Sequence, residues 1–164
     1  MNLDFASVGE MVADLVPEND ALICGENVVS WKDYDLRSSQ VASALSSAGL
    51  GPNSKAGLYL NNSNEYLISQ NAIFKIGGIP INVNYRYVEE ELIYLLDNSD
   101  AEAVFYHSCY SSRINKIAKS LPKVKAWIEV PDGNQSNFSQ CINYERILKD
   151  CSPMDRITRD PETI

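Results

Sequence analysis

KAGLYLNNSNEYLISQNAIFKIGGIPINV, residues 55–83, contains a complete strand–helix–strand pattern. The apolar run at 55–60 predicts a short strand, Asn62 or Ser63 can cap the helix that follows, and a glycine pair ends that helix. A second apolar run, 79–83, predicts another strand. Because strands joined through a helix form right-handed crossovers, the stretch predicts two parallel strands.

The same alternation continues on both sides of this stretch. We expect helices at 7–16, 30–48, 88–98 and 110–121, with strands at 102–106 and 125–130 and a short hairpin around the Gly25-Glu26-Asn27 turn. The sequence therefore predicts an α/β fold with a mostly parallel sheet flanked by helices and a short amino-terminal hairpin. We divide it into an α/β subdomain, 1–130, and a second part, 131–164, with a polar loop, a short helix at 143–149 and a tail without periodicity.

Composition limits the kinds of partner. The 164 residues include 14 basic and 22 acidic side chains, a formal net charge of -8, so nucleic acid is an unfavourable partner. The start, MNLDFASV, lacks the positive region of a secretory signal, and no apolar run is long enough to span a membrane. We expect a cytoplasmic protein that is not integral to a membrane. Its four cysteines form no C-x-x-C pair, so no metal site is predicted.

The stretch NVNYRYVEEEL, residues 82–92, carries the candidate site. Alternate side chains of a strand face opposite ways, so the apolar and the asparagine side chains of 79–84 lie on different faces. Asn84, Tyr85 and Arg86 then follow the carboxyl end of the strand, where open α/β sheets place ligands. These three residues either brace the turn into the next helix or contact a ligand, and we favour bracing because buried amides usually find backbone partners.

No residue pattern identifies a catalytic group. The single histidine, His107, ends a strand without a recognisable nucleophile or acid nearby in the sequence, so we interpret it as structural or exposed. The G-x-G-x-x-G, Walker and H-E-x-x-H motifs are absent. We predict no catalytic residue, no metal ligand and no cofactor within this sequence.

Three blocks carry a family resemblance: SWKDYDLRSSQVASAL, GLYLNNSNEYLISQNAIFKIGGIPINVNYRY and EEELIYLLDNSDA. Together they resemble the amino-terminal portion of acyl-CoA synthetases in the adenylate-forming, AMP-binding superfamily, and the form NVNYRYVEEEL resembles fatty-acid and steroid-side-chain CoA ligases. The resemblance implies the first subdomain of the large amino-terminal domain, with Asn82 and Asn84 at the end of a central strand. For the full-length parent it implies an acid–thiol ligase that uses ATP, Mg²⁺, CoA and a carboxylic acid of fatty-acyl type.

The sequence departs from that family at its end. The family's Ser/Thr/Gly-rich phosphate loop with its lysine, its later acidic residue for the ribose and its carboxy-terminal cap do not occur, and the tail DPETI lies about where the loop should soon follow. We therefore expect a fragment that is inactive alone, in which Arg86 could reach an anionic group of a substrate in the whole enzyme. A fragment should expose an apolar sheet face, through which a homo-oligomer could form. The alternative is a stand-alone, non-catalytic α/β module that binds a ligand or partner.

Overall fold

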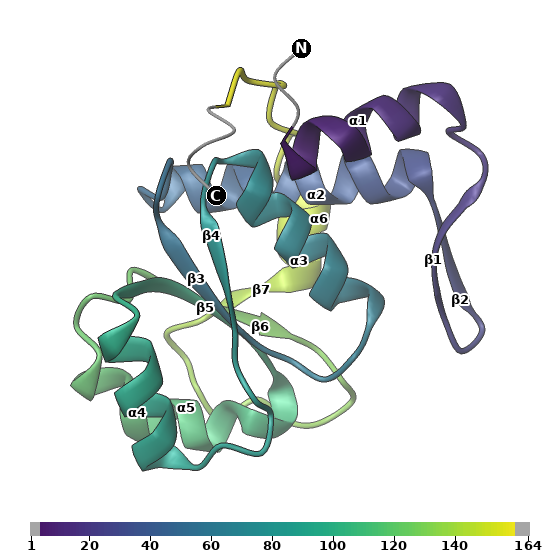
Figure 1. The fold of residues 1–164 in the computed structure, drawn as a ribbon. Coiled ribbons are helices and arrows are strands. Elements are labelled where there is room, and N and C mark those ends of the chain that lie inside the picture. Colours follow the sequence, from purple (N-terminus) through teal and green to yellow (C-terminus); the bar gives the residue numbers. More distant parts are fainter. Residues whose placement is uncertain (1–3, 160–164) are drawn as a thin grey trace.

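The computed structural model describes residues 4–159, and the last five residues, DPETI, lie outside the described part. Figure 1 shows the order of elements along the chain. The helices are α1 (Phe5–Leu15), α2 (Trp31–Ser47), α3 (Asn64–Lys75), α4 (Glu89–Asn98), α5 (Ser111–Ile117) and α6 (Tyr144–Asp150). The strands are β1 (Asp20–Cys24), β2 (Asn27–Ser30), β3 (Lys55–Tyr59), β4 (Ile79–Asn82), β5 (Ala101–His107), β6 (Ala126–Val130) and β7 (Ile142–Asn143).

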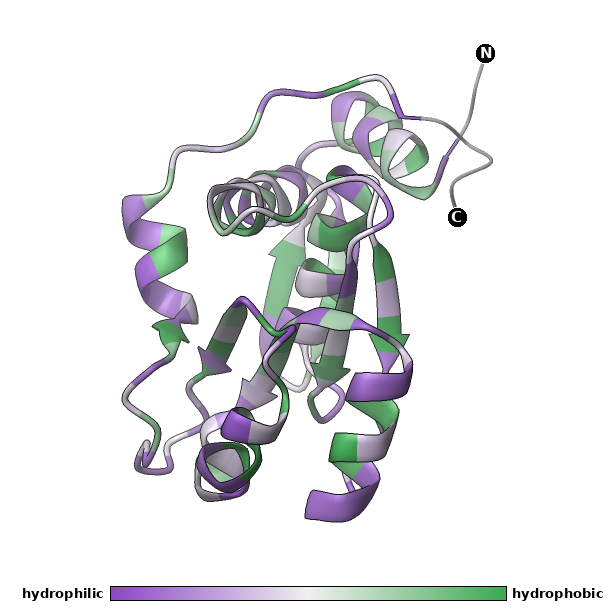
Figure 2. Cartoon of the chain, turned by 90° about the vertical axis from the view of Figure 1, so that its left-hand side faces the viewer, coloured by the Kyte–Doolittle hydropathy of each residue, from purple (hydrophilic) through white to green (hydrophobic). Residues whose placement is uncertain are grey.

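The core is one parallel sheet between two layers of helices. Its strand order is β4-β3-β5-β6-β7, and every neighbouring pair is parallel. Apolar side chains of α2, α3 and α6 cover one face, and those of α4 and α5 cover the other. In Figure 2 the sheet strands are largely hydrophobic, as strands buried on both faces should be. This architecture confirms the predicted α/β fold.

The order of strands corrects one expectation about β4. We expected a central strand, but within the described residues β4 pairs only with β3 and is the edge strand. Its side chains are correspondingly half-buried or exposed. The expected exposed sheet face is also not found between residues 4 and 159, because helices cover both faces of the sheet. Strand β7 was not predicted, since it has only two residues.

Local capping explains where the helices begin and end. Ser30 Oγ accepts a hydrogen bond from the backbone N–H of Asp33 at 3.1 Å at the start of α2. At the start of α3, Ser63 rather than Asn62 is the cap, because its Oγ accepts from Tyr66 N at 3.3 Å. Gly77 follows α3 with a φ of 71°, a left-handed conformation that glycine adopts at little cost.

Outside the sheet, β1 and β2 form an antiparallel hairpin that projects from the body of the molecule (Figure 1). Helix α1 lies against α2 and α3 at the opposite end from α4 and α5. No helix of the described chain is both long and apolar enough to cross a membrane. The predicted domain division at residue 130 stays a prediction.

Candidate functional site

The predicted site residues lie together in the turn between β4 and α4. The side-chain Oδ1 of Asn84 accepts a hydrogen bond from Arg86 N at 3.0 Å, and Tyr87 N donates to Asn84 O at 3.0 Å. The Arg86 guanidinium lies over the Tyr85 ring, 5.6 Å from its centroid. Asn84, Tyr85 and Arg86 are all exposed, so the side chains stand at the surface while the asparagine holds the turn.

Contacts from β3 and α5 hold the carboxyl end of this turn. Tyr59 Oη donates to the backbone carbonyl of Tyr87 at 3.0 Å, and Arg113 donates to the same carbonyl at 2.8 Å. Arg113 also donates to Tyr59 Oη. Burial raises the pKa of Tyr59 above its usual value, although the Arg113 hydrogen bond and charge oppose this shift, so the phenol stays protonated. These contacts support a bracing role for the turn.

A hollow of about 550 Å³ opens beside the turn. Asparagine and tyrosine side chains form much of its lining, and Tyr66 Oη donates to Asn82 Oδ1 at 3.1 Å across it. The residues around the hollow are Leu60, Asn62, Tyr66, Asn82, Val83, Asn84, Tyr85 and Tyr87. The residues that line the hollow are therefore uncharged, and Arg86 lies between two of them, Tyr85 and Tyr87, in the sequence.

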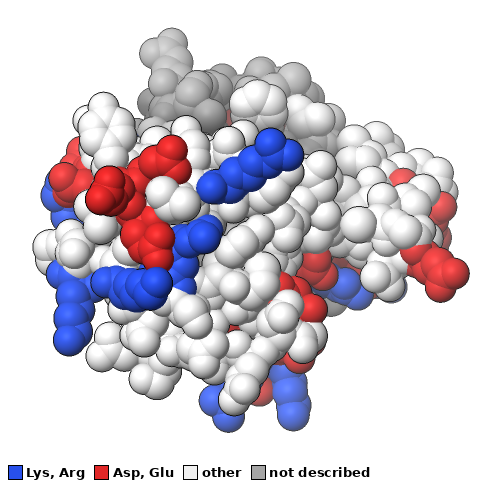
Figure 3. Space-filling view, turned by 90° about the horizontal axis from the view of Figure 1, so that it is seen from below, with Lys and Arg blue, Asp and Glu red and all other residues white. Residues whose placement is uncertain are grey.

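Figure 3 looks from below at the end of the molecule where α4 and α5 lie. Much of this surface is uncharged, and lysine and arginine side chains are interspersed with aspartate and glutamate near its margin. Between α5 and α4, Lys116 Nζ lies 2.9 Å from Glu89 Oε1. This mixed surface differs from the continuous basic surface that phosphate backbones require.

His107 links β5 to the segment that follows β3. Its Nδ1 accepts a hydrogen bond from Asn61 N at 3.1 Å, and Asn61 Oδ1 accepts from Tyr110 Oη at 3.0 Å. The side chain is buried, and this burial lowers the pKa of His107 so that the neutral form is favoured. The contact fits the structural interpretation of His107.

A buried carboxylate, Glu129, was missed by sequence reasoning. It accepts hydrogen bonds from Tyr106 Oη at 3.0 Å, Ser108 Oγ at 2.9 Å and Ser136 Oγ at 2.8 Å. Burial, with the nearby Cys141 and Glu129, strongly raises the pKa of Tyr106. The only sequence signal is an acidic residue inside the apolar strand AWIEV, which a buried partner must satisfy.

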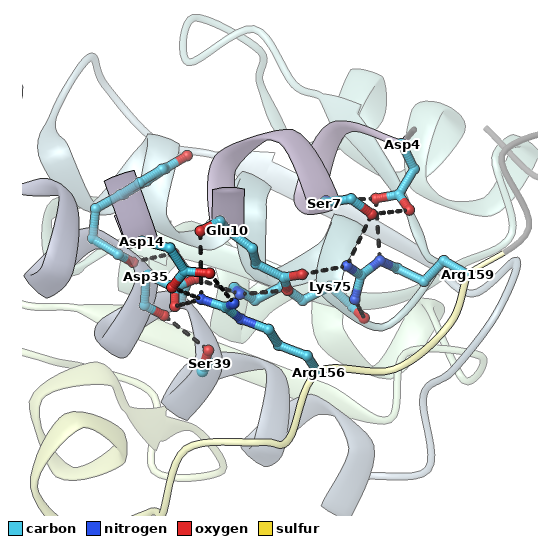
Figure 4. A network of polar contacts seen from close by, with 11 residues as sticks. Asp4, Ser7, Glu10, Asp14, Asp35, Ser39, Lys75, Arg156 and Arg159 are labelled. Atoms are coloured by element: carbon cyan, nitrogen blue, oxygen red, sulfur yellow. Dashed lines mark hydrogen bonds and ion pairs between the residues drawn. The ribbon is translucent and has the colours of Figure 1, made fainter. Parts of the chain in front are cut away.

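A second group that sequence reasoning missed is a largely buried ionic cluster at the other end of the molecule (Figure 4). Lys75 Nζ lies 2.9 Å from Glu10 Oε1 and 2.6 Å from Asp35 Oδ1. Arg159 contacts Glu10 Oε2 at 2.8 Å and Asp4 Oδ1 at 3.1 Å. We call Asp4, Glu10, Asp14, Asp35, Lys75, Arg156 and Arg159 the ionic cluster.

The contacts of the ionic cluster join the segment after α6 to α1 and α2. Arg156 donates to both carboxylate oxygens of Asp14, at 2.6 and 2.9 Å, and to Asp35 at 3.2 Å. Burial alone would raise the pKa of Asp4, but hydrogen bonds from Ser7 and the charge of Arg159 lower it below its usual value. The tail, which has no periodicity, is thus anchored by its two arginines to α1 and α2.

The residues present do not fit a magnesium–nucleotide site. Between residues 4 and 159 no group of three or more His, Cys, Asp or Glu side chains is placed to hold a metal ion. The sequence also has no glycine-rich loop of the kind that cradles phosphates with backbone N–H groups.

One family model and two curated relatives each match most of this chain. A family model described as AMP-binding enzyme matches residues 10–162. A 3-oxocholest-4-en-26-oate–CoA ligase of Rhodococcus rhodochrous is 39% identical over 155 residues, covering 93% of this chain and 28% of that protein. A medium/long-chain-fatty-acid–CoA/3-oxocholest-4-en-26-oate–CoA ligase of Mycobacterium marinum is 35% identical over 153 residues, covering 92% of this chain and 28% of that protein.

Solved structures agree on the fold. An anthranilate CoA ligase, AuaEII, superimposes with a TM-score of 0.87 at 18% identity, covering 97% of this chain and 30% of that one. A putative long-chain-fatty-acid CoA ligase from Rhodopseudomonas palustris gives a TM-score of 0.82 at 21% identity, covering 96% and 38%. The chain spans less than a third of the length of the curated relatives quoted above.

Proposed function

The chain belongs to the AMP-binding enzyme family, and from this membership we propose that it is the amino-terminal part of an ATP-dependent acyl-CoA ligase. In the reaction, a carboxylate oxygen attacks the α-phosphate of ATP and releases pyrophosphate, and the CoA thiol then displaces AMP from the acyl-adenylate. The first step gives the acid a good leaving group, so the protein's main tasks are positioning and charge stabilisation.

The identity with steroid-acid and fatty-acid CoA ligases carries this proposal. The match extends over 93% of the chain, with 39% identity to the Rhodococcus enzyme. We infer a fatty-acyl or steroid-side-chain acid as the substrate class, since both appear in the names of the relatives. The described residues would contribute a parallel α/β scaffold to such an enzyme.

Within the whole ligase, we propose that Asn84, Tyr85 and Arg86 border the substrate site. They lie at the carboxyl end of a parallel sheet, next to the hollow described above. Arg86 is cationic, exposed and held at a turn whose backbone is fixed by Asn84, Tyr59 and Arg113. A guanidinium in that position can form charge-assisted hydrogen bonds to a phosphate or carboxylate of the substrate.

The test begins with the source gene beyond the codon for Ile164. We expect the reading frame to continue into a Ser/Thr/Gly-rich loop with a lysine. The encoded polypeptide should then be incubated with ATP, Mg²⁺, CoA and a panel of medium-chain, long-chain and steroid-side-chain acids. Mass spectrometry should detect the acyl-CoA thioester and AMP, whereas the 164-residue chain alone should form neither.

Two outcomes would contradict the proposal. A stop codon directly after Ile164 would favour a stand-alone module that binds a ligand or partner without catalysis. A longer polypeptide that folds but forms neither adenylate nor thioester with any acid in the panel would reject the ligase activity itself.

A further inference from the structure

The guanidinium of Arg113, on α5, closes a triangle of hydrogen bonds at the end of the β4–α4 turn. Arg113 Nη1 donates to the backbone carbonyl of Tyr87 at 2.8 Å and also to Tyr59 Oη. Tyr59 Oη in turn donates to the same carbonyl at 3.0 Å. Because Tyr59 is completely buried in β3, this triangle fixes the end of the turn to the core of the sheet.

The same guanidinium also reaches the other wall of the hollow beside the turn. One wall comes from the turn itself, and the other includes Asn62 from the segment that follows β3. The Arg113 guanidinium lies 6.0 Å from the centroid of the Tyr110 ring, and Tyr110 Oη donates to Asn61 Oδ1 at 3.0 Å. Arg113 therefore contacts one wall directly, through the Tyr87 carbonyl, and the other through Tyr110.

A role as a simple link between α4 and α5 does not account for these contacts. Arg113 Nε lies 3.8 Å from Glu89 Oε2 on α4, whereas Lys116, on the same helix as Arg113, lies 2.9 Å from the same carboxylate. The short contacts of Arg113 go to the Tyr87 carbonyl and to Tyr59 instead. A planar guanidinium suits this place because it can serve two acceptors while it lies against an aromatic ring.

We propose that Arg113 is a positioning residue of the substrate site, which sets the place of Arg86 relative to the opposite wall of the hollow. The inference rests on the proposed function, under which Arg86 contacts an anionic group of the acid or of CoA. Arg86 directly precedes Tyr87, whose carbonyl Arg113 holds. Since binding depends steeply on the position of the groups that contact a substrate, release of this carbonyl should weaken substrate binding.

A double-mutant cycle in the whole ligase tests this role. The KM and kcat for CoA and for the acid are measured for Arg113→Met, for Arg86→Ala and for the variant with both substitutions. Arg113→Met should raise the same KM that Arg86→Ala raises, about three- to tenfold, and should change kcat less than about twofold. The double variant should have the KM of Arg86→Ala alone, because the position of the turn no longer matters once the Arg86 guanidinium is absent.

Two other variants complete the experiment. Lys116→Met is the control, because it removes a cation from the same helix without touching the turn, and it should leave both KM values unchanged. If Arg113→Met does not fold, Tyr59→Phe replaces it. That substitution removes one of the two donors to the Tyr87 carbonyl and should raise the same KM about two- to threefold.

Several results would overturn the inference. Unchanged KM values in Arg113→Met, beside a raised KM in Arg86→Ala, would reject the positioning role while keeping the role of Arg86. KM effects that multiply in the double variant would show that Arg113 acts on the substrate independently of Arg86. A lower kcat with both KM values unchanged would leave Arg113 a structural role only. A longer polypeptide that folds but forms no thioester would reject the proposed function, and this positioning role with it.

Discussion

Replacing Lys75 by methionine should strongly destabilise the fold. Lys75 is almost completely buried on α3, and its ammonium lies 2.9 Å from Glu10 and 2.6 Å from Asp35. Removing one partner of a buried ion pair costs about 3–5 kcal/mol, because the remaining charge stays desolvated without compensation. Methionine keeps the length and helix propensity of the side chain, so the substitution mainly removes the charge.

The cost should fall near the lower end of that range. After the substitution Glu10 still contacts Arg159 at 2.8 Å, and Asp35 still contacts Arg156 at 3.2 Å. We therefore expect a loss of about 3 kcal/mol in the free energy of unfolding, or roughly 6–12 °C in Tm for a domain of this size. The difference should persist at 1 M NaCl, since buried pairs are screened much less than exposed ones.

Urea unfolding followed by circular dichroism measures this change. Lys116→Met is the matched control, because Lys116 pairs with Glu89 at 2.9 Å but its side chain is 69% exposed. The control should be close to wild type, since exposed ion pairs contribute little. A loss of less than about 1 kcal/mol in Lys75→Met, or equal losses in the two variants, would refute the expected cost of leaving Glu10 and Asp35 without the Lys75 ammonium.

Three further predictions address the turn, the histidine and a close backbone contact. In the whole ligase, Arg86→Ala should raise the KM for CoA or for the acid about tenfold with little change in kcat. Arg146, an exposed arginine on α6, provides the control, and Arg146→Ala should leave both KM values unchanged. Unchanged KM values for both substrates in Arg86→Ala would remove the anion-binding role of Arg86. Burial lowers the pKa of His107, so below pH ~6.5 the unfolded chain binds the proton more readily, and the free energy of unfolding should decrease as the pH decreases. His107→Asn should flatten this pH dependence in urea unfolding at pH 5 to 8. Parallel pH profiles for the wild type and His107→Asn would contradict this prediction. Gly78→Ala should lower the free energy of unfolding by about 1–3 kcal/mol, because the added Cβ would lie 2.9 Å from Ser54 O. A Cβ at Gly51 would meet open space, so Gly51→Ala should be tolerated. Similar unfolding midpoints for the two variants would show that the backbone around Gly78 relaxes.

Local patterns predicted most of the elements. The strand–helix alternation from 55 to 83 and the cap at Ser63, one of the two residues proposed for it, depend on residues within a few positions of one another, and the structure has them where expected. The position of Asn84 to Arg86 at the carboxyl end of a strand also followed from local order. The partners that hold this turn could not be predicted, because Tyr59 and Arg113 come from segments 54 residues apart.

Features that depend on distant pairing were missed or wrong. The edge position of β4 depends on β5 pairing with β3 on the other side, which no local period encodes. Periodicity indicates that 7–16 is amphipathic but not which side is buried. That choice is made by Lys75 and Arg159, whose contacts with α1 span 65 and up to 155 positions.

The contact between Arg159 and Asp4 also has a consequence for the order of events on the ribosome. The two residues are 155 positions apart, so about 8 to 30 s of synthesis separate them at roughly 5–20 residues per second. The strands and helices from β3 to β6 emerge within that interval and can form before either arginine is available. Helix α1 is therefore synthesised early but gains its ion pairs with Arg156 and Arg159 late. A ribosome that stalls before residue 156 would expose α1 without either of these two cations.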